Sequence, residues 1–345
     1  MRRTAHNTAL QRLRADPVGS LALLGVLVFV AMVAASSSGW LAQGWNQEVA
    51  EPSAPPSWFA ESAPVGVTSA PNSVTLSERI DLSPIDPLAP YYNEWSAKAA
   101  TYPKQELQRA QHLTFGADRL GRDVFSKAVK GAEVSITVGL MAALLATGLG
   151  TLLGALGGFM GDKVGDVTEW LYNVFTAIPG ILLVFMFAAV FNRSDSIFPR
   201  GVVTLTLILG FTSWTGVYRL VRAEFIKHAN LDYVRAAQAL GASKMRCMFV
   251  HILPNVNHVA LVQLSVLVVA CIKAEVILSY LGLGVAVDQV SWGSMLAEAQ
   301  SELLLGHWWQ LAVATVFMAA FVTAFSFLTD ALRDALDPKT VASKR

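Results

Sequence analysis

The sequence is short of charge, of cysteine and of catalytic motifs. Only 15% of its 345 residues are charged, whereas 54% are hydrophobic; a soluble domain carries about 25% charge. Such a chain has too few polar groups to cover its apolar surface in water, so the lipid bilayer is the expected solvent. The two cysteines, Cys247 and Cys271, have no metal-binding spacing, and we expect no disulfide between them.

Signatures of bond-making chemistry are also missing. The chain has neither the G-x-x-x-x-G-K-[ST] pattern that cradles nucleotide phosphates nor the H-E-x-x-H zinc motif. Its six histidines are scattered without ligand spacing, and no Ser/His/Asp arrangement is suggested. We therefore expect a conduit rather than an enzyme, with no catalytic, cofactor or metal site. If transport is energised, the ATP must be bound by another chain.

Six apolar stretches are long enough to cross the hydrocarbon core, which takes about 20 residues. They predict an all-α membrane protein with six transmembrane helices, the third of which is broken by Pro179. The first helix, with its polar flank, extends to residue 43. It follows a basic N-terminus, which would also suit a cleaved signal peptide, but the length of the apolar run favours a retained anchor. The stretches are residues 18–35, 134–159, 167–191, 202–220, 256–281 and 308–328.

The distribution of basic residues predicts the orientation, because short loops rich in Lys and Arg stay in the cytoplasm. Such residues gather in the N-terminus (1–17), in the loop between the fourth and fifth spans (222–255) and toward the tail (339–345). With six spans, all three segments fall on the same side of the membrane. We therefore expect both termini in the cytoplasm.

Residues 44–120 differ from the rest of the chain. They hold nine of the fourteen prolines, with nine acidic residues against five basic ones. This composition predicts an extended segment with short turns rather than a packed helix. We expect the segment to be extracytoplasmic, either as a functional element or as a tolerated loop insertion.

The loop between the fourth and fifth spans contains the polar, basic sequence DYVRAAQALGASKMRCMFVHILPN. Asn230 or Asp232 is suited to cap a helix start, and Gly241 is suited to end that helix in the left-handed conformation. Pro254 is expected to break a second helix before the fifth span. The pattern predicts a helix, a sharp turn and a helix on the cytoplasmic face, which either docks on a partner or packs under its own bundle.

The same loop resembles the signature of ABC importer permeases: Glu-Ala-Ala, three residues, Gly, nine residues, Ile, one residue, Leu-Pro. Here it is Arg235-Ala236-Ala237, then Gly241, then HILP at residues 251–254. Further segments resemble the peptide-importer branch in the right order. They are FGADRLGRDV (115–124), LSYLGLGV (278–285), SWGSMLAEA (291–299) and DALRDALDP (330–338).

The chain as a whole resembles the second permease subunit of dipeptide, oligopeptide and nickel ABC importers. The resemblance covers residues 112–338 and the N-terminal RLRADPVGSLALLGV. It implies a type I ABC importer permease fold in the bacterial inner membrane, with the transmembrane domain over residues 121–338. The implied substrate is a di- or oligopeptide, with nickel or metal chelates, or another small solute, as the alternative.

The resemblance also implies partners. These are a homologous six-span permease, two cytoplasmic ATPases that carry the ATP and Mg, an extracytoplasmic substrate-binding protein and membrane lipid, but no nucleic acid. In the resembled family the loop is a coupling helix that sits in a groove of the ATPase. Arg235 departs from the family's Glu, so the groove is expected to carry an acidic residue. Carried over by position, the coupling residues are Asp232, Tyr233, Arg235, Ala236, Ala237, Leu240, Gly241 and Ser243.

Lys273, Glu275 and Pro179 are candidates for the translocation path or its gate. A charge deep in a span costs roughly 2.5–3.5 kcal/mol, so it usually faces a cavity or a partner. Lys273 and Glu275 are two positions apart on a helix and should point to different faces. Snorkelling to the interface, or pairing across a permease interface, is the alternative for both, as plain bundle geometry is for Pro179.

Two other classes of protein fit the sequence less well. A stand-alone secondary transporter with Glu275 as its proton site predicts inverted repeats, and no clear repeat is present. A membrane receptor would need a compact outer domain, against which the prolines argue. Within the second span, Gly150, Gly154 and Gly158 recur every four residues, a pattern that predicts close helix packing.

Overall fold

The computed structural model of the chain describes residues 16–59, 86–101, 113–191, 201–286 and 288–336. In these residues the regular structure is helical, apart from one isolated antiparallel bridge between Ala117 and Asp123. The chain forms two compact units, one of Met1–Asn46 with Val124–Arg345 and one of Gln47–Asp123.

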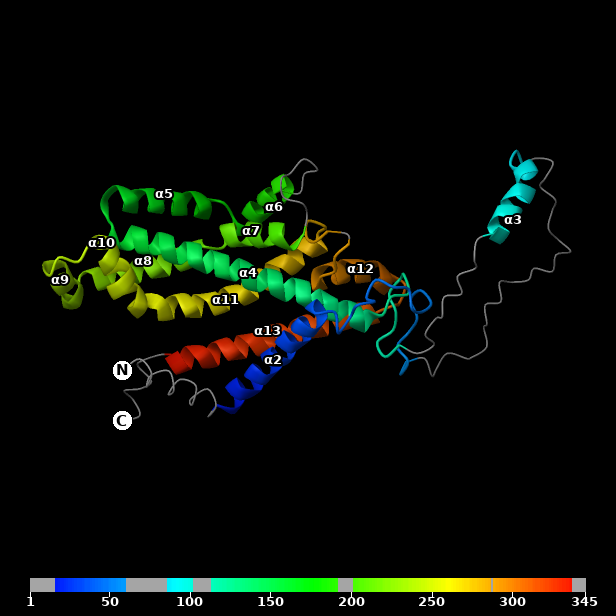
Figure 1. The fold of residues 1–345 in the computed structure, drawn as a ribbon, viewed down its shortest axis with the longest axis horizontal. Helices are drawn as coiled ribbons and strands as arrows, with labels where there is room; N and C mark the ends of the chain where they lie inside the picture. The colour runs from blue at the N-terminus through cyan, green and yellow to red at the C-terminus, as the bar shows by residue number, and fades with distance from the viewer. Residues whose placement is uncertain (1–15, 60–85, 102–112, 192–200, 287, 337–345) are drawn as a thin grey trace. The chain divides into compact units, whose positions relative to one another are not determined.

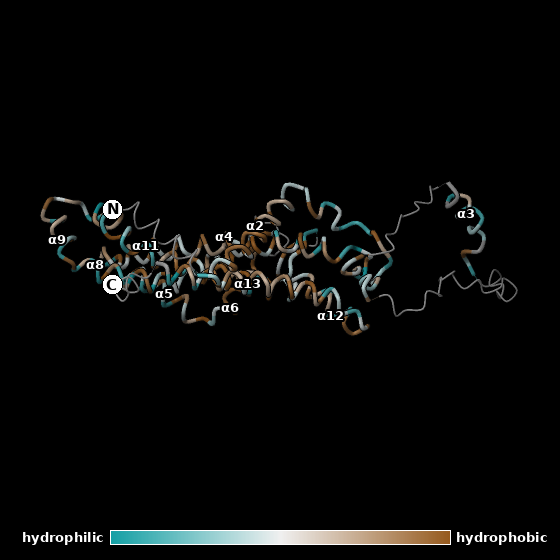
Figure 2. Tube along the Cα trace, turned by 90° about the horizontal axis from the view of Figure 1, so that it is seen from below, coloured by the Kyte–Doolittle hydropathy of each residue, from teal (hydrophilic) through white to brown (hydrophobic). Residues whose placement is uncertain are grey.

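The larger unit is a bundle of long helices (Figure 1). The long helix α4 lies at its centre and packs against α7, α8 and α11, while α13 packs against α2. Hydrophobic residues dominate the tube around α2, α4 and α13, and hydrophilic stretches appear toward α8 and α9 (Figure 2). Its helices are α2 (Pro17–Ser37), α4 (Val124–Phe159), α5 (Asp162–Ala177), α6 (Gly180–Phe191), α7 (Val202–Thr212), α8 (Thr215–Ala229), α9 (Asp232–Ala239), α10 (Lys244–Arg246), α11 (Leu253–Tyr280), α12 (Trp292–Leu304) and α13 (Trp309–Leu336).

Close packing of α4 on α8 depends on the three glycines at four-residue spacing. A Cβ at Gly150 would lie 2.7 Å from the carbonyl oxygen of Trp214, and one at Gly158 would lie 2.7 Å from that of Arg222. Gly154 meets the α8 backbone in the same way. The prediction of close packing is confirmed, because a side chain at any of these positions would push the two helices apart.

Among the residues that the structure describes, four helices are long and apolar enough to cross a membrane, and the α5–α6 pair makes a fifth if it is taken as one span. That pair is bent by 91° around Pro179, where the sequence predicted a break. The predicted fourth span, 202–220, is instead divided at Ser213–Trp214 between α7 and α8, and α7 alone is a short apolar helix of 11 residues. The long helices are Pro17–Ser37, Val124–Phe159, Lys244–Tyr280 and Trp309–Asp334.

The expectation of a helix break at Pro254 is wrong. Helix α10 continues through a π-helical turn, η4 (Cys247–Ile252), into α11, where Pro254 occupies the first turn. In that turn the backbone N–H of Leu253 donates to the carbonyl oxygen of Met248, five residues back. A π-helical turn widens the helix by one residue, and Pro254 needs no N–H partner at the start of α11. The proline is therefore accommodated without a break.

The smaller unit joins two segments that are distant in sequence, residues 47–59 and 113–123. The N–H of Ala50 donates to the carbonyl oxygen of Gly121 at 3.0 Å, and the N–H of Ala117 donates to that of Ala54 at 2.8 Å. The buried carboxylate of Asp118 accepts from the N–H groups of Leu120 and Arg122, and from the Arg122 guanidinium at 2.7 Å. Asp118 therefore closes the turn at the end of the second segment.

The same unit contains an element that the sequence prediction missed. Residues 92–101 form helix α3 (Tyr92–Thr101), preceded by the 3₁₀ turn η3 (Ala89–Tyr91). The prolines at 84, 87 and 90 dominated the composition, but the next ten residues contain none. An ion pair of 2.7 Å between Lys98 and Glu94, one turn apart, supports the helix. Extended structure therefore does not hold for the whole of residues 44–120.

Candidate functional site

The α9–α10 hairpin (residues 231–246) lies at one end of the larger unit, and α12 lies at the other (Figure 1). Its turn is a Schellman motif. The N–H of Ala242 donates to the carbonyl oxygen of Ala237, and the N–H of Gly241 donates to that of Gln238. Gly241 has φ +85°, which confirms the predicted left-handed helix stop. A Cβ added there would meet no other atom within 4 Å, so the glycine is required by the backbone rather than by crowding.

The capping prediction at the start of α9 is wrong. The N-cap residue is Leu231, whose side chain has no polar atom, and no side chain caps the helix. Asn230 instead ends α8, where its amide Nδ2 donates to the Ile226 carbonyl oxygen. Asp232 lies in the first turn of α9, where its negative charge is favourable at the N-terminal end of the helix dipole.

An apolar cluster anchors the hairpin to the bundle. Val234 is fully buried, and it belongs to the same cluster as Phe225 of α8 and Met248 and Ile252 of η4. Ala237 is half-buried and packs against this cluster. Burying a side chain the size of valine stabilises by about 1.5–3 kcal/mol. One face of α9 is thus held by the protein's own core.

Tyr233 ties the hairpin to two neighbouring helices. Its hydroxyl lies 2.8 Å from Nδ1 of His228 in α8, and it accepts from Nδ2 of Asn255 in α11 at 3.5 Å. Partial burial lowers the pKa of His228, and the nearby Glu224 carboxylate opposes that shift. The neutral imidazole is therefore favoured beside the tyrosine.

The opposite face of the hairpin is exposed. Leu240 is 89% exposed at the tip, and Asp232, Arg235, Ala236 and Gly241 are exposed as well. The guanidinium of Arg235 makes no hydrogen bond or ion pair with any residue in the described ranges. Seven of the eight predicted coupling residues are exposed, and only Ala237 is half-buried. Tyr233 and Ser243 also form hydrogen bonds that hold the hairpin's own structure. Ser243 caps α10, accepting from the N–H of Arg246 at 3.3 Å.

The other end of the unit contains a buried polar cluster around Glu275 of α11. Its carboxylate is fully buried and accepts from the hydroxyls of Ser135 in α4 at 2.7 Å and Ser279 in α11 at 2.6 Å. The Ser135 hydroxyl also accepts from the N–H of Trp292 at 3.2 Å. Glu275 therefore joins α4, α11 and the start of α12 inside this chain.

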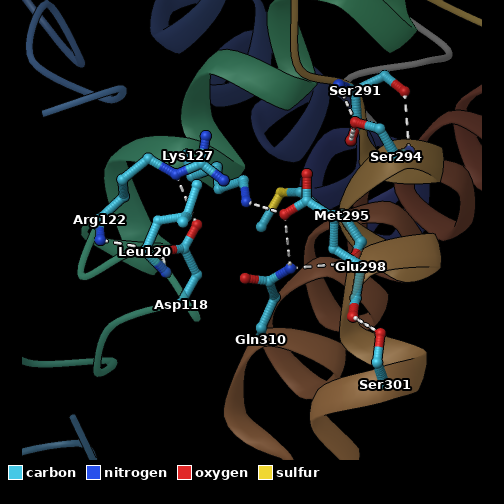
Figure 3. Close-up of polar contacts among 10 residues, drawn as sticks. All are labelled: Asp118, Leu120, Arg122, Lys127, Ser291, Ser294, Met295, Glu298, Ser301 and Gln310. Carbon is cyan, nitrogen blue, oxygen red and sulfur yellow. Dashed lines mark hydrogen bonds and ion pairs between the residues drawn. The ribbon is translucent and has the colours of Figure 1, made fainter. Parts of the chain in front are cut away.

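A second polar cluster includes Lys127, Glu298 and Gln310, which Figure 3 shows. The ammonium of Lys127 in α4 is buried and pairs with the Glu298 carboxylate of α12, whose side chain is 26% exposed. Gln310 of α13 donates to the same carboxylate at 3.5 Å and to the carbonyl oxygen of Met295 at 3.1 Å. Lys127 and Gln310 thus hold α12 between α4 and α13.

Lys273 is placed differently from Glu275, which confirms that they face different sides. Its side chain is exposed and lines a cavity of about 410 Å³ between α6, the end of α7 and α11. Pro179 is exposed directly before α6, whose first residues Gly180 and Ile181 line the same cavity. Of the three predicted path residues, Lys273 therefore faces open space, Pro179 adjoins it, and Glu275 is enclosed.

Sequence reasoning missed Lys127, Ser135, Glu298 and Gln310. Lys127 and Glu298 are 171 residues apart, and nothing in the sequence pairs them. The available signal was that Lys127 lies within an unbroken helical pattern that continues into the second span. Helix α4 indeed begins at Val124, ten residues before the predicted span.

The parts of the chain that the structure describes contain neither a cluster of metal ligands nor a disulfide. There, no three His, Cys, Asp or Glu side chains are grouped so that they could hold a metal ion. Cys247 and Cys271 are both buried, unpaired thiols.

Comparison with known proteins identifies relatives over most of the chain. Residues 150–342 match the family described as binding-protein-dependent transport system inner membrane component. The dipeptide transport system permease protein DppC of Bacillus subtilis (strain 168) is 33% identical over 252 residues, which cover 73% of this chain and 77% of the relative. The oligopeptide transport system permease protein OppC of the same organism is 32% identical, covering 73% and 80%. Escherichia coli (strain K12) DppC is 39% identical over 235 residues, covering 68% and 75%.

Proposed function

The chain belongs to the family of binding-protein-dependent transport system inner membrane components, and from this premise we propose that it is one permease subunit of an ATP-driven importer of di- or oligopeptides. As a family member it is a transport subunit rather than an enzyme. The peptide specificity is supported by the relatives, whose names are those of dipeptide and oligopeptide permeases.

The proposed topology has six spans: α2, α4, α5–α6, α7–α8, α10–α11 and α13. The α9–α10 hairpin and both termini lie in the cytoplasm, and residues 44–120 lie outside. The basic character of the hairpin supports this orientation, because Arg235, Lys244 and Arg246 are all exposed against Asp232 alone. The first span is retained as an anchor.

The proposed complex contains a homologous six-span permease, two cytoplasmic ATPases and an extracytoplasmic substrate-binding protein. ATP and Mg are held by the ATPase chains, and this chain binds no cofactor. ATP binding draws the ATPases together, and the hairpins carry that movement to the spans, so that the path between the two permeases opens outward. Hydrolysis returns it to the inward-facing state.

Within this chain, the movement enters through the exposed face of the hairpin and leaves through its buried face. Five of the exposed residues, Asp232, Arg235, Ala236, Leu240 and Gly241, contact the groove of the ATPase. Leu240 is the large apolar side chain beside the turn at Gly241. Val234 is locked into the cluster with Phe225 and Met248, so a push on the hairpin is transmitted to α8 and α11. A densely packed cluster transmits displacement because it has few voids to absorb it.

The observation that carries the proposal is the exposure of Leu240, because a large apolar side chain that is 89% exposed at a hairpin tip fits a pocket on a partner. The test replaces it in the full importer, Leu240→Glu, and measures ATPase subunits retained on the purified permeases. Leu304→Glu is the matched control, because Leu304 is 86% exposed at the end of α12, on the other side of the bundle.

We expect Leu240→Glu to lower ATPase retention at least tenfold, as burying a charge without a partner costs well over 1.4 kcal/mol. Leu304→Glu should leave retention unchanged. Equal retention by both variants and the wild type would refute docking through this face. Uptake by the intact importer of a labelled dipeptide, in competition with nickel chelates, then decides the substrate class.

A further inference from the structure

We propose that Lys273 is a recognition site for the carboxylate of the transported solute, set in the apolar cavity between α6, α7 and α11. The proposal rests on the proposed function as a peptide permease and adds to it the residue, and the chemical group, by which this chain would contact its solute.

The cavity has the composition of a ligand site. Its volume of about 410 Å³ lies within the roughly 300–1,000 Å³ typical of small-molecule pockets. Val184, Phe185 and Ile277 supply apolar wall, Thr212 and Ser213 add polar groups, and Lys273 is the one charged residue in the lining. In small-molecule sites, a few polar groups in an apolar wall fix the orientation of the ligand, here by its charged end.

The ammonium of Lys273 has no counter-ion among the residues that the structure describes. It forms no ion pair with them, and it makes no side-chain hydrogen bond with them. The nearest acidic residue in sequence, Glu275, is buried on another face and bonded to Ser135 and Ser279. A lysine within a span costs roughly 2.5–3.5 kcal/mol unless it faces water or a partner, so an anion is the missing complement.

A free peptide supplies that anion. Its C-terminal carboxylate would pair with the ammonium of Lys273, and its side chains would lie against Phe185, Val184 and Ile277. The C-terminal end of α7 lies on the same wall, at Thr212, and the negative end of the helix dipole favours a cation, such as the peptide's amino group, there. Lysine acts as a point charge rather than a two-pronged clamp, which suits a solute that must bind and leave.

The first arm of the test measures the potential of the cavity without any peptide. In the full importer, Ile277→Cys places a thiol in the lining, and its modification by anionic and cationic methanethiosulfonate reagents is compared. We expect the anionic reagent to react several-fold faster relative to the cationic one than it does with a small model thiol. Lys273→Gln should abolish that preference, and Lys273→Arg should keep it.

Leu261→Cys is the matched control, because Leu261 lines a different cavity of similar size, about 390 Å³, between α4 and α11. Its anionic-to-cationic ratio should not change with Lys273→Gln. An unchanged ratio at Ile277→Cys would overturn the proposal, because it would mean that Lys273 is sheltered from the cavity. Loss of the second permease from purified Lys273→Gln complexes would also overturn it, since the lysine would then pair with that subunit.

The second arm identifies the ligand group. Dialanine should slow modification of Ile277→Cys with Lys273 present and fail to do so with Lys273→Gln, whereas dialanine amide should not protect in either. Protection by both compounds, or by neither, would refute carboxylate recognition. Dipeptide uptake measured on the same wild-type importer separates the outcomes: uptake without protection refutes this site alone, and absence of uptake refutes the peptide function.

Discussion

The two ends of the larger unit are held in opposite ways. At the hairpin end, the anchor is apolar, with Val234 among Phe225, Met248 and Ile252, and the charged residues face outward. At the α12 end, the anchor is polar, with the buried Lys127–Glu298 pair and Glu275 among serines. An apolar anchor leaves polar groups free for a partner, whereas a polar anchor uses them up inside the chain.

Breaking the polar anchor should have the largest effect. Glu298→Gln leaves the ammonium of Lys127 buried without its carboxylate, and removal of one member of a buried pair costs about 3–5 kcal/mol. Because Glu298 is 26% exposed, we expect the lower part of that range. The measurement is the thermal unfolding midpoint of the purified importer.

Glu169→Gln is the control for that experiment, because its ion pair with Arg222 is half-exposed on the carboxylate side and such pairs contribute roughly 0–1 kcal/mol. The double variant Lys127→Met/Glu298→Leu should recover part of the loss, since it leaves no unpaired charge. Equal midpoints for Glu298→Gln and Glu169→Gln would contradict a polar anchor.

The same glycine turn occurs at both ends of the larger unit, after α9 and after α11. Gly282 follows α11 with φ +76° and repeats the hydrogen bonds of Gly241, from the N–H groups of Gly282 and Leu283 to Ser279 and Leu278. Neither glycine has an atom within 4 Å of an added Cβ. Gly241→Leu and Gly282→Leu should therefore each cost about 1–2 kcal/mol of backbone strain.

The functional outcome of these two variants should differ. Gly241→Leu adds bulk to the docking face and should abolish peptide-stimulated ATP hydrolysis, whereas Gly282→Leu should lower only the unfolding midpoint. Equal stimulation in both variants, measured at a temperature where both are folded, would remove the distinction between the two ends.

Reversing the charge on the exposed face should have a smaller effect. Arg235→Glu touches no described partner within the chain, so stability should change by less than about 0.5 kcal/mol. If the ATPase groove carries an acidic residue, the reversal should weaken ATPase retention several-fold, and more so at low salt because exposed charges are screened. Arg235→Gln should lie between the wild type and the reversal. No salt-dependent difference among the three would reject an acidic groove.

The smallest effect concerns pH at the hairpin. Burial lowers the pKa of His228 relative to the unfolded chain, where it is about 6.5. Its contribution to stability is therefore present above that pH and is lost as the pH falls through the lowered folded value. Unfolding midpoints between pH 7.5 and 5.5 should decline less in His228→Asn than in wild type. His307→Asn serves as control, because His307 lies between α12 and α13, away from His228, and identical slopes in all three proteins would argue against the burial of His228.

Much of the fold was predictable from local pattern. Apolar length placed five of the six predicted spans on long or paired helices, Pro179 marked the bend, and Gly241 marked the turn. The sequence predictions were wrong at the start of α9 and at Pro254. Leu231 takes the N-cap position that Asn230 or Asp232 was expected to fill, and the π-helical turn absorbs Pro254.

The candidate sites divide in the same way. The helix and turn of the hairpin followed from spacing, since glycine ends a short helix, whereas the coupling residues on it were carried over by position from the resembled family. Helical geometry predicted that Lys273 and Glu275 point in different directions, but it did not predict what surrounds each side chain. Which of the two would be enclosed by serines and which would line a cavity depended on α4, α6 and α7, far away in the sequence.

The sequence by itself determined that the helices are suited to a lipid bilayer, where most of them lie in the chain, and that the chain turns at Gly241. Hydropathy, proline and glycine are enough for this because they act over a few residues at a time. The tertiary structure alone decided that Lys127 meets Glu298, that Glu275 is buried and that Lys273 faces a cavity. Those facts depend on which helices pack side by side, and the free energy of a buried charge is set by neighbours that the local sequence does not name.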